Sequence, residues 1–292
     1  MSDFLHVDGE LVSRDERHLS ALDRGFRYGD AVFETFRVYG GTPYAWERHL
    51  DRLERSAATI RLYHGIGRED LRDRVEETLA ANELQEAYLR LSISRGVQPG
   101  TLEPRQEVDP TVVIQVEPLP RGGVEGTAVW DRPIDCTIGD TQRVPAEAIP
   151  AHIKSHNYLN GILATIEARD AGVDQAILLD ADGMLTEATT ANLFFVTDGV
   201  LHTPSVEEVP VLPGITREDV LELADTMDIP TERGRWKPTV LHRADEVFLT
   251  NTTWEVRPVR SIDDTSYPVG SVTDQLRRAY TARIERLCYA DS

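Results

Sequence analysis

The first hundred residues switch between strand-like and helical patterns, which restricts the chain to a mixed fold. Residues 31–39 alternate between apolar and polar side chains, and Gly40-Gly41 predicts a tight turn into a second strand over 42–46. Residues 47–60 then place apolar side chains at helical spacing, and residues 71–84 predict a second amphipathic helix. Hairpins and helices mixed in this way indicate an α+β fold.

The rest of the chain continues the mixture and predicts two domains. The remaining predicted strands are 88–94, 111–116, a region near 127–138, 175–180, 192–197 and 246–250, and the remaining predicted helices are 157–170, 216–227 and 272–287. Residues 119–126 hold one proline and three glycines between periodic segments, which predicts a linker. We therefore expect an N-terminal α+β domain over 1–118 and a C-terminal domain over 127–292, an α+β or α/β architecture.

The charge balance limits the possible partners. A formal net charge of -19 argues against nucleic acid and anionic membranes, whose phosphates repel such a surface. Acidic residues spread over every segment, with almost no lysine, are typical of adaptation to molar salt, as in haloarchaea. The start of the sequence does not resemble a signal peptide, and no apolar run approaches the roughly 20 residues of a spanning helix. We expect a soluble, cytoplasmic, halophilic protein.

Cysteine and lysine are both scarce, and the lysines are informative. Cys136 and Cys288 are too few and too isolated for a disulfide framework or a structural zinc site, so no metal is expected. The chain has two lysines, Lys154 and Lys237, against 29 arginines (31 basic residues less two). Arginine supplies charge but cannot form a Schiff base, whereas a neutral lysine amine can. Lys154, in the polar segment 151–160, is thus the first candidate for a covalent role, with an ordinary surface charge as the alternative.

Four further segments suit a phosphorylated aldehyde cofactor. Glu187 lies among small polar residues before an apolar strand and could hold a heteroaromatic nitrogen protonated. Residues 212–218 open a helix whose free N–H groups could bind a phosphate, and residues 249–255 end a strand with small hydroxyl and amide groups that could add contacts to it. Arg52 lies beside the apolar stripe of its helix. Taken singly, such features are more often an exposed glutamate, a helix cap, a turn and a solvated arginine.

Together, the order and spacing of these segments resemble the fold-type IV pyridoxal-phosphate enzymes, the class IV aminotransferases. This family includes branched-chain aminotransferases, D-amino-acid aminotransferases and 4-amino-4-deoxychorismate lyases. The resemblance extends from Val7-Asp8-Gly9 to residues 254–259, and it is most specific in the lysine segment, in residues 186–195 and in Gly214–Arg217.

The resemblance implies roles for particular residues. Lys154 is the residue that binds pyridoxal 5′-phosphate covalently, Glu187 pairs with the pyridine nitrogen, and Tyr158 approaches the phenolic oxygen. The residues implied for the phosphate and its surrounding loops are Arg52, Ile215, Thr216, Asn251 and Thr252. The resemblance also implies two domains with the site between them, the lysine in the C-terminal domain, and a homodimer whose second subunit completes the site.

The subfamily motifs conflict. Phe33-Glu34-Thr35 resembles the lyases, Tyr88-Leu89-Arg90 resembles the branched-chain aminotransferases, and Ser94-Arg95-Gly96 resembles the D-amino-acid enzymes. Arginine binds a carboxylate through two parallel hydrogen bonds, so Arg37, Arg90 and Arg95 are all candidates for the substrate carboxylate. The predicted substrate-binding residues are Tyr28, Phe33, Arg37, Tyr88, Arg90, Arg95 and Thr253.

These motifs predict an aminotransferase that moves an amino group from neutral or branched-chain L-amino acids to 2-oxoglutarate. A lyase that forms 4-aminobenzoate and pyruvate, as in folate biosynthesis, is the first alternative, and a D-amino-acid aminotransferase is the second. A non-catalytic binding protein is disfavoured because both Lys154 and Glu187 are intact.

Overall fold

The computed structural model describes residues 2–16, 18–105, 107–121 and 132–289. The chain divides into two compact units. The first holds Met1–Glu125, Ile153–Asn157 and Cys288–Ser292, and the second holds Gly126–His152 and Tyr158–Leu287. Of the predicted linker 119–126, residues 122–126 lie outside the described residues.

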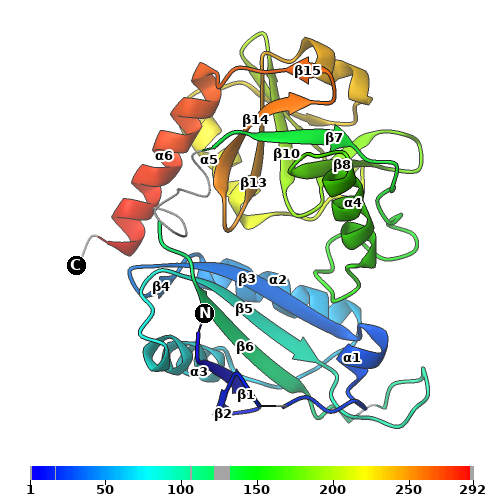
Figure 1. Ribbon diagram of the computed structural model, residues 1–292, viewed down its shortest axis with the longest axis vertical. Helices are drawn as coiled ribbons and strands as arrows, with labels where there is room; N and C mark the ends of the chain where they lie inside the picture. Colours follow the sequence, from blue (N-terminus) through cyan, green and yellow to red (C-terminus); the bar gives the residue numbers. More distant parts are fainter. Residues whose placement is uncertain (1, 17, 106, 122–131, 290–292) are drawn as a thin grey trace. The chain divides into compact units, whose positions relative to one another are not determined.

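The first unit is a six-stranded antiparallel sheet with two long helices packed on one face (Figure 1). The strand order is β2-β1-β6-β5-β3-β4. Its elements are β1 (Phe4–Val7), β2 (Glu10–Ser13), α1 (Arg24–Tyr28), β3 (Ala31–Tyr39), β4 (Thr42–Pro43), α2 (Trp46–Thr59), α3 (Arg68–Ala81), β5 (Ala87–Ser94) and β6 (Thr111–Pro118).

The predicted hairpin and helices are present, with shifted ends. β3 spans the predicted residues, and Gly40 and Gly41 make the turn with φ of 54° and 79°, a conformation that favours glycine. The next strand stops at Pro43 and does not reach Trp46, because α2 begins there. α3 begins three residues before the predicted helix, since the charged first turn Arg68–Asp70 carries no apolar periodicity.

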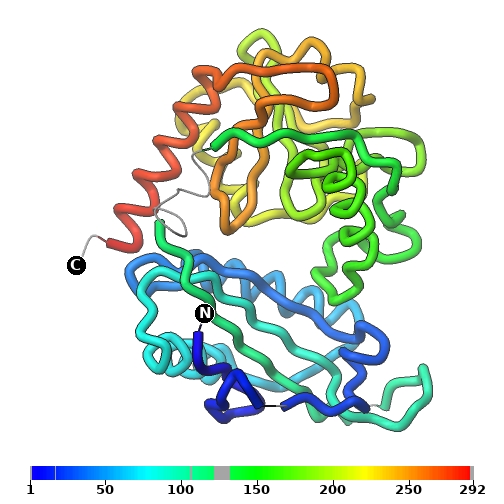
Figure 2. Tube along the Cα trace, in the orientation of Figure 1, coloured from blue at the N-terminus to red at the C-terminus, as the bar shows by residue number. Residues whose placement is uncertain are grey.

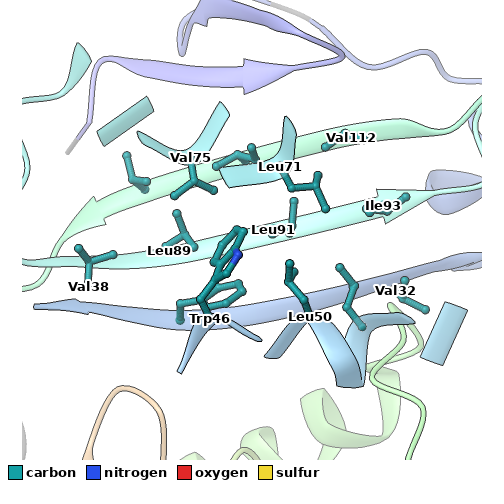
Figure 3. Close-up of a cluster of buried hydrophobic side chains, with 14 of the residues drawn as sticks. Val32, Val38, Trp46, Leu50, Leu71, Val75, Leu89, Leu91, Ile93 and Val112 are labelled. Carbon is teal, nitrogen blue, oxygen red and sulfur yellow. The ribbon is translucent and has the colours of Figure 1, made fainter. Parts of the chain in front are cut away.

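The core of the first unit lies between the sheet and α2 and α3. Figure 3 shows side chains of β3 and β5, such as Val32 and Leu91, meeting Leu50 of α2 and Val75 of α3. Because side chains alternate along a strand, every second residue of β3 faces this core and the others face away. The second set includes Phe33, on the sheet face that the helices leave open.

The second unit is built on a mixed sheet with the strand order β12-β11-β10-β13-β14-β7-β8-β9. β9 also pairs with β10, so β10, β13, β14, β7, β8 and β9 form a closed circuit. Its elements are β7 (Ile134–Ile138), α4 (Leu159–Asp170), β8 (Gln175–Leu179), β9 (Leu185–Ala188), β10 (Asn192–Thr197), β11 (Val200–Pro204), α5 (Ile215–Thr226), β12 (Thr231–Gly234), the 3-10 helix η2 (Pro238–Arg243), β13 (Glu246–Asn251), β14 (Glu255–Ile262), β15 (Thr265–Ser266) and α6 (Ser271–Cys288).

Segments distant in sequence lie side by side in this circuit. β14 pairs in parallel with β7, seen as an orange segment beside a green one in Figure 2. Of the strand predicted near 127–138, the part before 132 lies outside the described residues, and the remainder is β7. Among the described residues, no helix combines the length and the apolar character that crossing a membrane requires.

The segment Ile153–Asn157, which carries Lys154, groups with the first unit, whereas the sequence predicts this lysine in the C-terminal domain. The physical reason is backbone pairing at the edge of β3. The N–H of Phe33 donates to the carbonyl of Lys154 at 3.0 Å, and the N–H of His156 donates to the carbonyl of Ala31 at 3.0 Å. Domains predicted as continuous sequence ranges cannot show that five residues, 153–157, pack with the first unit.

Candidate active site

Lys154 is held by its backbone while its side chain lies on the open sheet face. Its N–H donates to Ser56 Oγ of α2 at 3.1 Å, and its carbonyl accepts from Phe33. This pairing sets Lys154 opposite Phe33, so both side chains lie on the same face of the sheet. The lysine Nζ lies 4.3 Å from the centre of the Phe33 ring. The amine therefore projects from a fixed backbone.

The register of β3 and β5 gathers most of the predicted substrate residues on that open face. Thr35 pairs with Arg90 and Arg37 pairs with Tyr88, next to Phe33. Residues directly opposite each other in an antiparallel pair share a face, so these side chains line one surface together with Lys154. In the sequence, the motifs around Phe33, Arg90 and Lys154 are far apart, and nothing there shows that they share a surface.

Arg90 lies against the same aromatic ring, Phe33, as the Lys154 amine. Its guanidinium carbon lies 3.7 Å from the centre of the Phe33 ring, and its Nε donates to Ser92 Oγ at 3.2 Å. His156 packs edge-on against Phe33, with ring centres 5.6 Å apart. Burial, together with the positive charge of Arg90, lowers the pKa of His156 to about 4, so this ring is neutral at neutral pH.

Arg95, a predicted substrate-binding residue, has its guanidinium bound by protein acceptors. It is buried, and Nε and Nη2 donate to Asp30 at 2.8 and 3.0 Å. Nη2 also donates to the carbonyl of Ile60, and Nη1 donates to that of Arg61. In the structure Arg95 thus links Asp30 to the residues that follow α2.

Arg37 and Tyr28 also have protein partners. Arg37 is 1% exposed, with Nη2 3.7 Å from the Glu86 carboxylate and its guanidinium over the Tyr39 ring. Tyr28 ends α1, where the guanidinium groups of Arg24 and Arg27 lie about 5 Å from its ring centre. Of the three predicted carboxylate ligands, Arg90 alone lies next to Phe33 in the described contacts.

Arg52 takes part in a buried charge cluster on the helix side of the sheet. Its Nε and Nη2 donate to the two carboxylate oxygens of Glu34 at 2.8 and 2.7 Å, and Nδ1 of His49 lies 2.7 Å from Glu34 Oε2. Burial alone raises the pKa of Glu34, but Arg52 and His49 outweigh it and lower the pKa to about 2. Because the ionised carboxylate only accepts, His49 Nδ1 must carry the proton.

The second cluster lies in the other unit around Glu187 of β9. Arg143 Nε donates to Glu187 Oε1 at 2.7 Å, the N–H of Leu212 donates to Oε2 at 3.1 Å, and Asn192 Nδ2 lies 3.4 Å from Oε2. An ionised carboxylate offers about four lone-pair sites, so three donors leave a position for one more N–H. The carboxylate is oriented by the protein and still able to accept.

The N-terminus of α5 has the features of an anion site. Gly214 is the N-cap, and no side chain caps the helix. Ile215 and Thr216 are buried, and within the described residues neither N–H has a protein acceptor. The first N–H groups of a helix lack intrahelical partners and carry its positive dipole end, so two buried ones favour a bound anion.

The loop after β13 is shaped by Asn251. Its Oδ1 accepts from the N–H and hydroxyl of Thr253, at 3.0 and 3.1 Å, and from the N–H of Trp254 at 2.8 Å. Its Nδ2 donates to the Thr190 carbonyl at 3.3 Å. The amide oxygen thus shapes the loop that presents Thr252, and the amide nitrogen ties that loop to the turn between β9 and β10. Tyr158, in the same unit, occupies the N-cap position of α4 and is half-buried.

Sequence reasoning missed several partners that the structure brings in. Glu34 had one local signal, since a charged residue occupies a core-facing position between Val32 and Phe36. Arg143 is 44 residues from Glu187, and no pattern in the sequence connects the two. In the described part of the chain, no group of three or more His, Cys, Asp or Glu side chains forms a candidate metal site.

Comparison with known proteins gives a consistent family. The amino-transferase class IV model matches residues 31–262. A protein of Methanocaldococcus jannaschii, provisionally named a branched-chain-amino-acid aminotransferase, is 36% identical over 282 residues, 94% of each chain. The D-alanine aminotransferase of Listeria monocytogenes is 32% identical over 97% of this chain and 96% of its own. The branched-chain aminotransferase structure from Escherichia coli superposes with a TM-score of 0.89 at 30% identity, covering 97% of this chain and 94% of its own.

The chain belongs to the class IV aminotransferases, enzymes of the fold-type IV architecture that depend on pyridoxal phosphate. It is a pyridoxal-phosphate-dependent aminotransferase, as the sequence predicted. The described residues fit the cofactor: two buried, acceptor-free N–H groups suit a phosphate, and Glu187 retains capacity for a ring N–H.

Proposed function

We propose that this aminotransferase takes neutral or branched-chain L-amino acids as donors and 2-oxoglutarate as acceptor. The observation that carries the proposal is the open sheet face, where Lys154, Phe33, Tyr88 and Arg90 lie in one register. Aromatic rings beside one arginine suit a substrate with an apolar side chain and one carboxylate. The relative named for branched-chain substrates supports the same class.

In this proposal the chain's own residues divide the chemistry. Bound pyridoxal phosphate supplies an electron sink for the pair left when the substrate loses its Cα proton. Lys154 Nζ would take the proton at the substrate Cα and return it, acting as base and then acid. Arg90 binds the substrate carboxylate, and Phe33 holds the lysine side chain over its ring.

Other residues hold the cofactor in place. We assign the phosphate to Arg52, to the N–H groups of Ile215 and Thr216, and to Thr252. Glu187 pairs with the pyridine nitrogen and Tyr158 with the phenolic oxygen. Asn251 acts indirectly, by shaping the loop that carries Thr252.

A lyase acting on 4-amino-4-deoxychorismate is the second candidate. Thr35 favours it, because this side chain lies on the open face directly opposite Arg90. The sequence resemblance places glycine at this position in typical branched-chain enzymes and threonine in the lyases. A hydroxyl at that position narrows the space beside Arg90 and adds a hydrogen-bonding group.

One enzyme preparation can distinguish the two reactions. Transamination leaves the substrate's amino group on the cofactor, whereas the lyase reaction restores the aldehyde form. We expect L-leucine, L-isoleucine or L-valine to convert the enzyme to its pyridoxamine form, and 2-oxoglutarate to reverse the change, as followed by absorbance. D-Alanine in a parallel cuvette tests chirality. Rapid release of 4-aminobenzoate and pyruvate, without transfer from any neutral amino acid, would establish the lyase instead.

We also propose that the enzyme is a homodimer, on the basis of α4. Leu159, Ile162, Leu163 and Ile166 recur at helical spacing and are 38–68% exposed. Water-exposed stripes of this kind mark association surfaces. A second copy is the proposed occupant, because the family resemblance implies a dimer and most soluble oligomers are symmetric assemblies of one chain.

A charge placed in this stripe should separate the subunits. We expect Ile162→Glu to sediment as a monomer at concentrations where the parent is a dimer, because two copies of the charge would be buried without partners. Val269→Glu is the matched control, since Val269 is comparably exposed but lies outside α4. A dimeric Ile162→Glu protein would rule out α4 as the interface.

A further inference from the structure

Asn192 lies where the strand circuit of the second unit closes. It begins β10, is 6% exposed, and pairs through its backbone with Thr250 on one side and Glu187 on the other. Its pairing with Glu187 is the register that connects β9 to β10. A residue at this junction can hold the Glu187 carboxylate at a fixed distance from the other segments that the same residue contacts.

The other contact of Asn192 is the segment that leads into α5. Asn192 Nδ2 donates to the Leu212 carbonyl at 2.9 Å, while the N–H of the same Leu212 donates to Glu187 Oε2 at 3.1 Å. Asn192 Nδ2 also lies 3.4 Å from Glu187 Oε2. Both polar groups of the Leu212 backbone are therefore bound by the pair Asn192 and Glu187.

Gly214 shows how closely this segment approaches Asn192. A Cβ atom added to Gly214 would lie 2.0 Å from Asn192 Oδ1, far inside van der Waals contact. The φ of Gly214 is -73°, which any residue adopts, so close approach and not backbone conformation requires the glycine. Gly214 is also the N-cap of α5, so the contact places the helix N-terminus directly.

We propose that Asn192 is a positioning residue that sets the N-terminus of α5 at a fixed position relative to the Glu187 carboxylate. The inference rests on the proposed roles of these two groups as the phosphate and ring-nitrogen sites. Asn192 contacts both groups but is assigned no contact with the phosphate or the ring nitrogen. Asn192 fixes the distance between the N-terminus of α5 and the Glu187 carboxylate before the cofactor binds. Cofactor binding then does not have to order the segment from Leu212 to Gly214.

The test compares ligands with and without the phosphate. We measure the affinity of apoenzyme for pyridoxal 5′-phosphate and for pyridoxal, and take their ratio as the phosphate advantage. We expect Asn192→Ala to reduce this ratio about tenfold, in proportion to the hydrogen bonds lost. A merely structural role lowers both affinities together and leaves the ratio unchanged.

Asn82→Ala is the matched control. Asn82 also donates to backbone carbonyls, those of Thr78 and Phe4, but it lies in the first unit. Its substitution should lower thermal stability and leave the phosphate advantage at the wild-type value. An Asn192→Ala enzyme with an unchanged ratio overturns the inference. A wild-type enzyme without any phosphate advantage contradicts the phosphate role of α5 as well.

A suppressor pair tests the steric contact. Gly214→Ala should lose cofactor affinity because its Cβ displaces Asn192 or the helix N-terminus. Adding Asn192→Ser removes the Oδ1 atom in question, so the double variant should bind pyridoxal 5′-phosphate more tightly than Gly214→Ala alone. A Gly214→Ala variant that keeps the wild-type affinity would show that the contact with Asn192 does not fix this segment.

Discussion

Replacing Lys154 by alanine is expected to reduce turnover by at least the 10²–10⁴-fold that a positioned general base contributes, as a rough lower limit. The fold should persist, because the contacts of Lys154 with Ser56 and Phe33 use its backbone N–H and carbonyl, which alanine keeps. Steady-state kinetics and a thermal melt measure the two effects separately.

Lys237→Ala is the control for this experiment. Lys237 is the only other lysine of the chain and is exposed beside η2. Borohydride reduction followed by peptide mapping should find the pyridoxyl group on Lys154 in both the parent and this control. A label on Lys237, or an active Lys154→Ala enzyme, would refute the assignment.

Replacing Glu34 by glutamine should cause the largest loss of stability, about 3–5 kcal/mol. Glu34 is fully buried and is bound through both carboxylate oxygens by Arg52, with His49 as a third partner. The amide keeps the shape but leaves the Arg52 guanidinium buried without its counter-charge. Urea unfolding, followed by far-ultraviolet circular dichroism, measures the change.

The pH dependence gives a second signature of the same cluster. The folded-state pKa of Glu34 is lowered to about 2, below its ordinary value of 4.5. A carboxyl group with a depressed pKa stabilises the fold fully above its unfolded value, and this contribution is lost as pH falls through the window from 4.5 to about 2. The Glu34→Gln variant should lack this component of acid unfolding.

Asp70→Asn provides the matched comparison for Glu34→Gln. Asp70 pairs with Arg74 on the surface of α3 at 2.8 Å, and exposed helical pairs contribute only about 0.3–0.5 kcal/mol. A Glu34→Gln protein that loses no more stability than Asp70→Asn would show that the buried cluster is not important to the fold.

Much of the first unit could be predicted from the sequence because its elements have local causes. The alternation of β3, the Gly40-Gly41 turn and the apolar spacing of α2 are each contained within about fifteen residues, and each is present in the structure. β14 was not predicted. It contains Pro258, which argues against a strand, yet pairs with both β13 and β7.

The sequence by itself determined the family and the chemistry, because the motifs around Lys154, Glu187 and the start of α5 are recognisable from the types of their residues and their order along the chain. Only the tertiary structure decided which charged residues work together. Glu34 binds Arg52 across 18 positions, Arg143 reaches Glu187 across 44, and Arg95 is engaged by Asp30 across 65. Such pairs depend on strand register and helix packing, which bring together residues with no local signal connecting them.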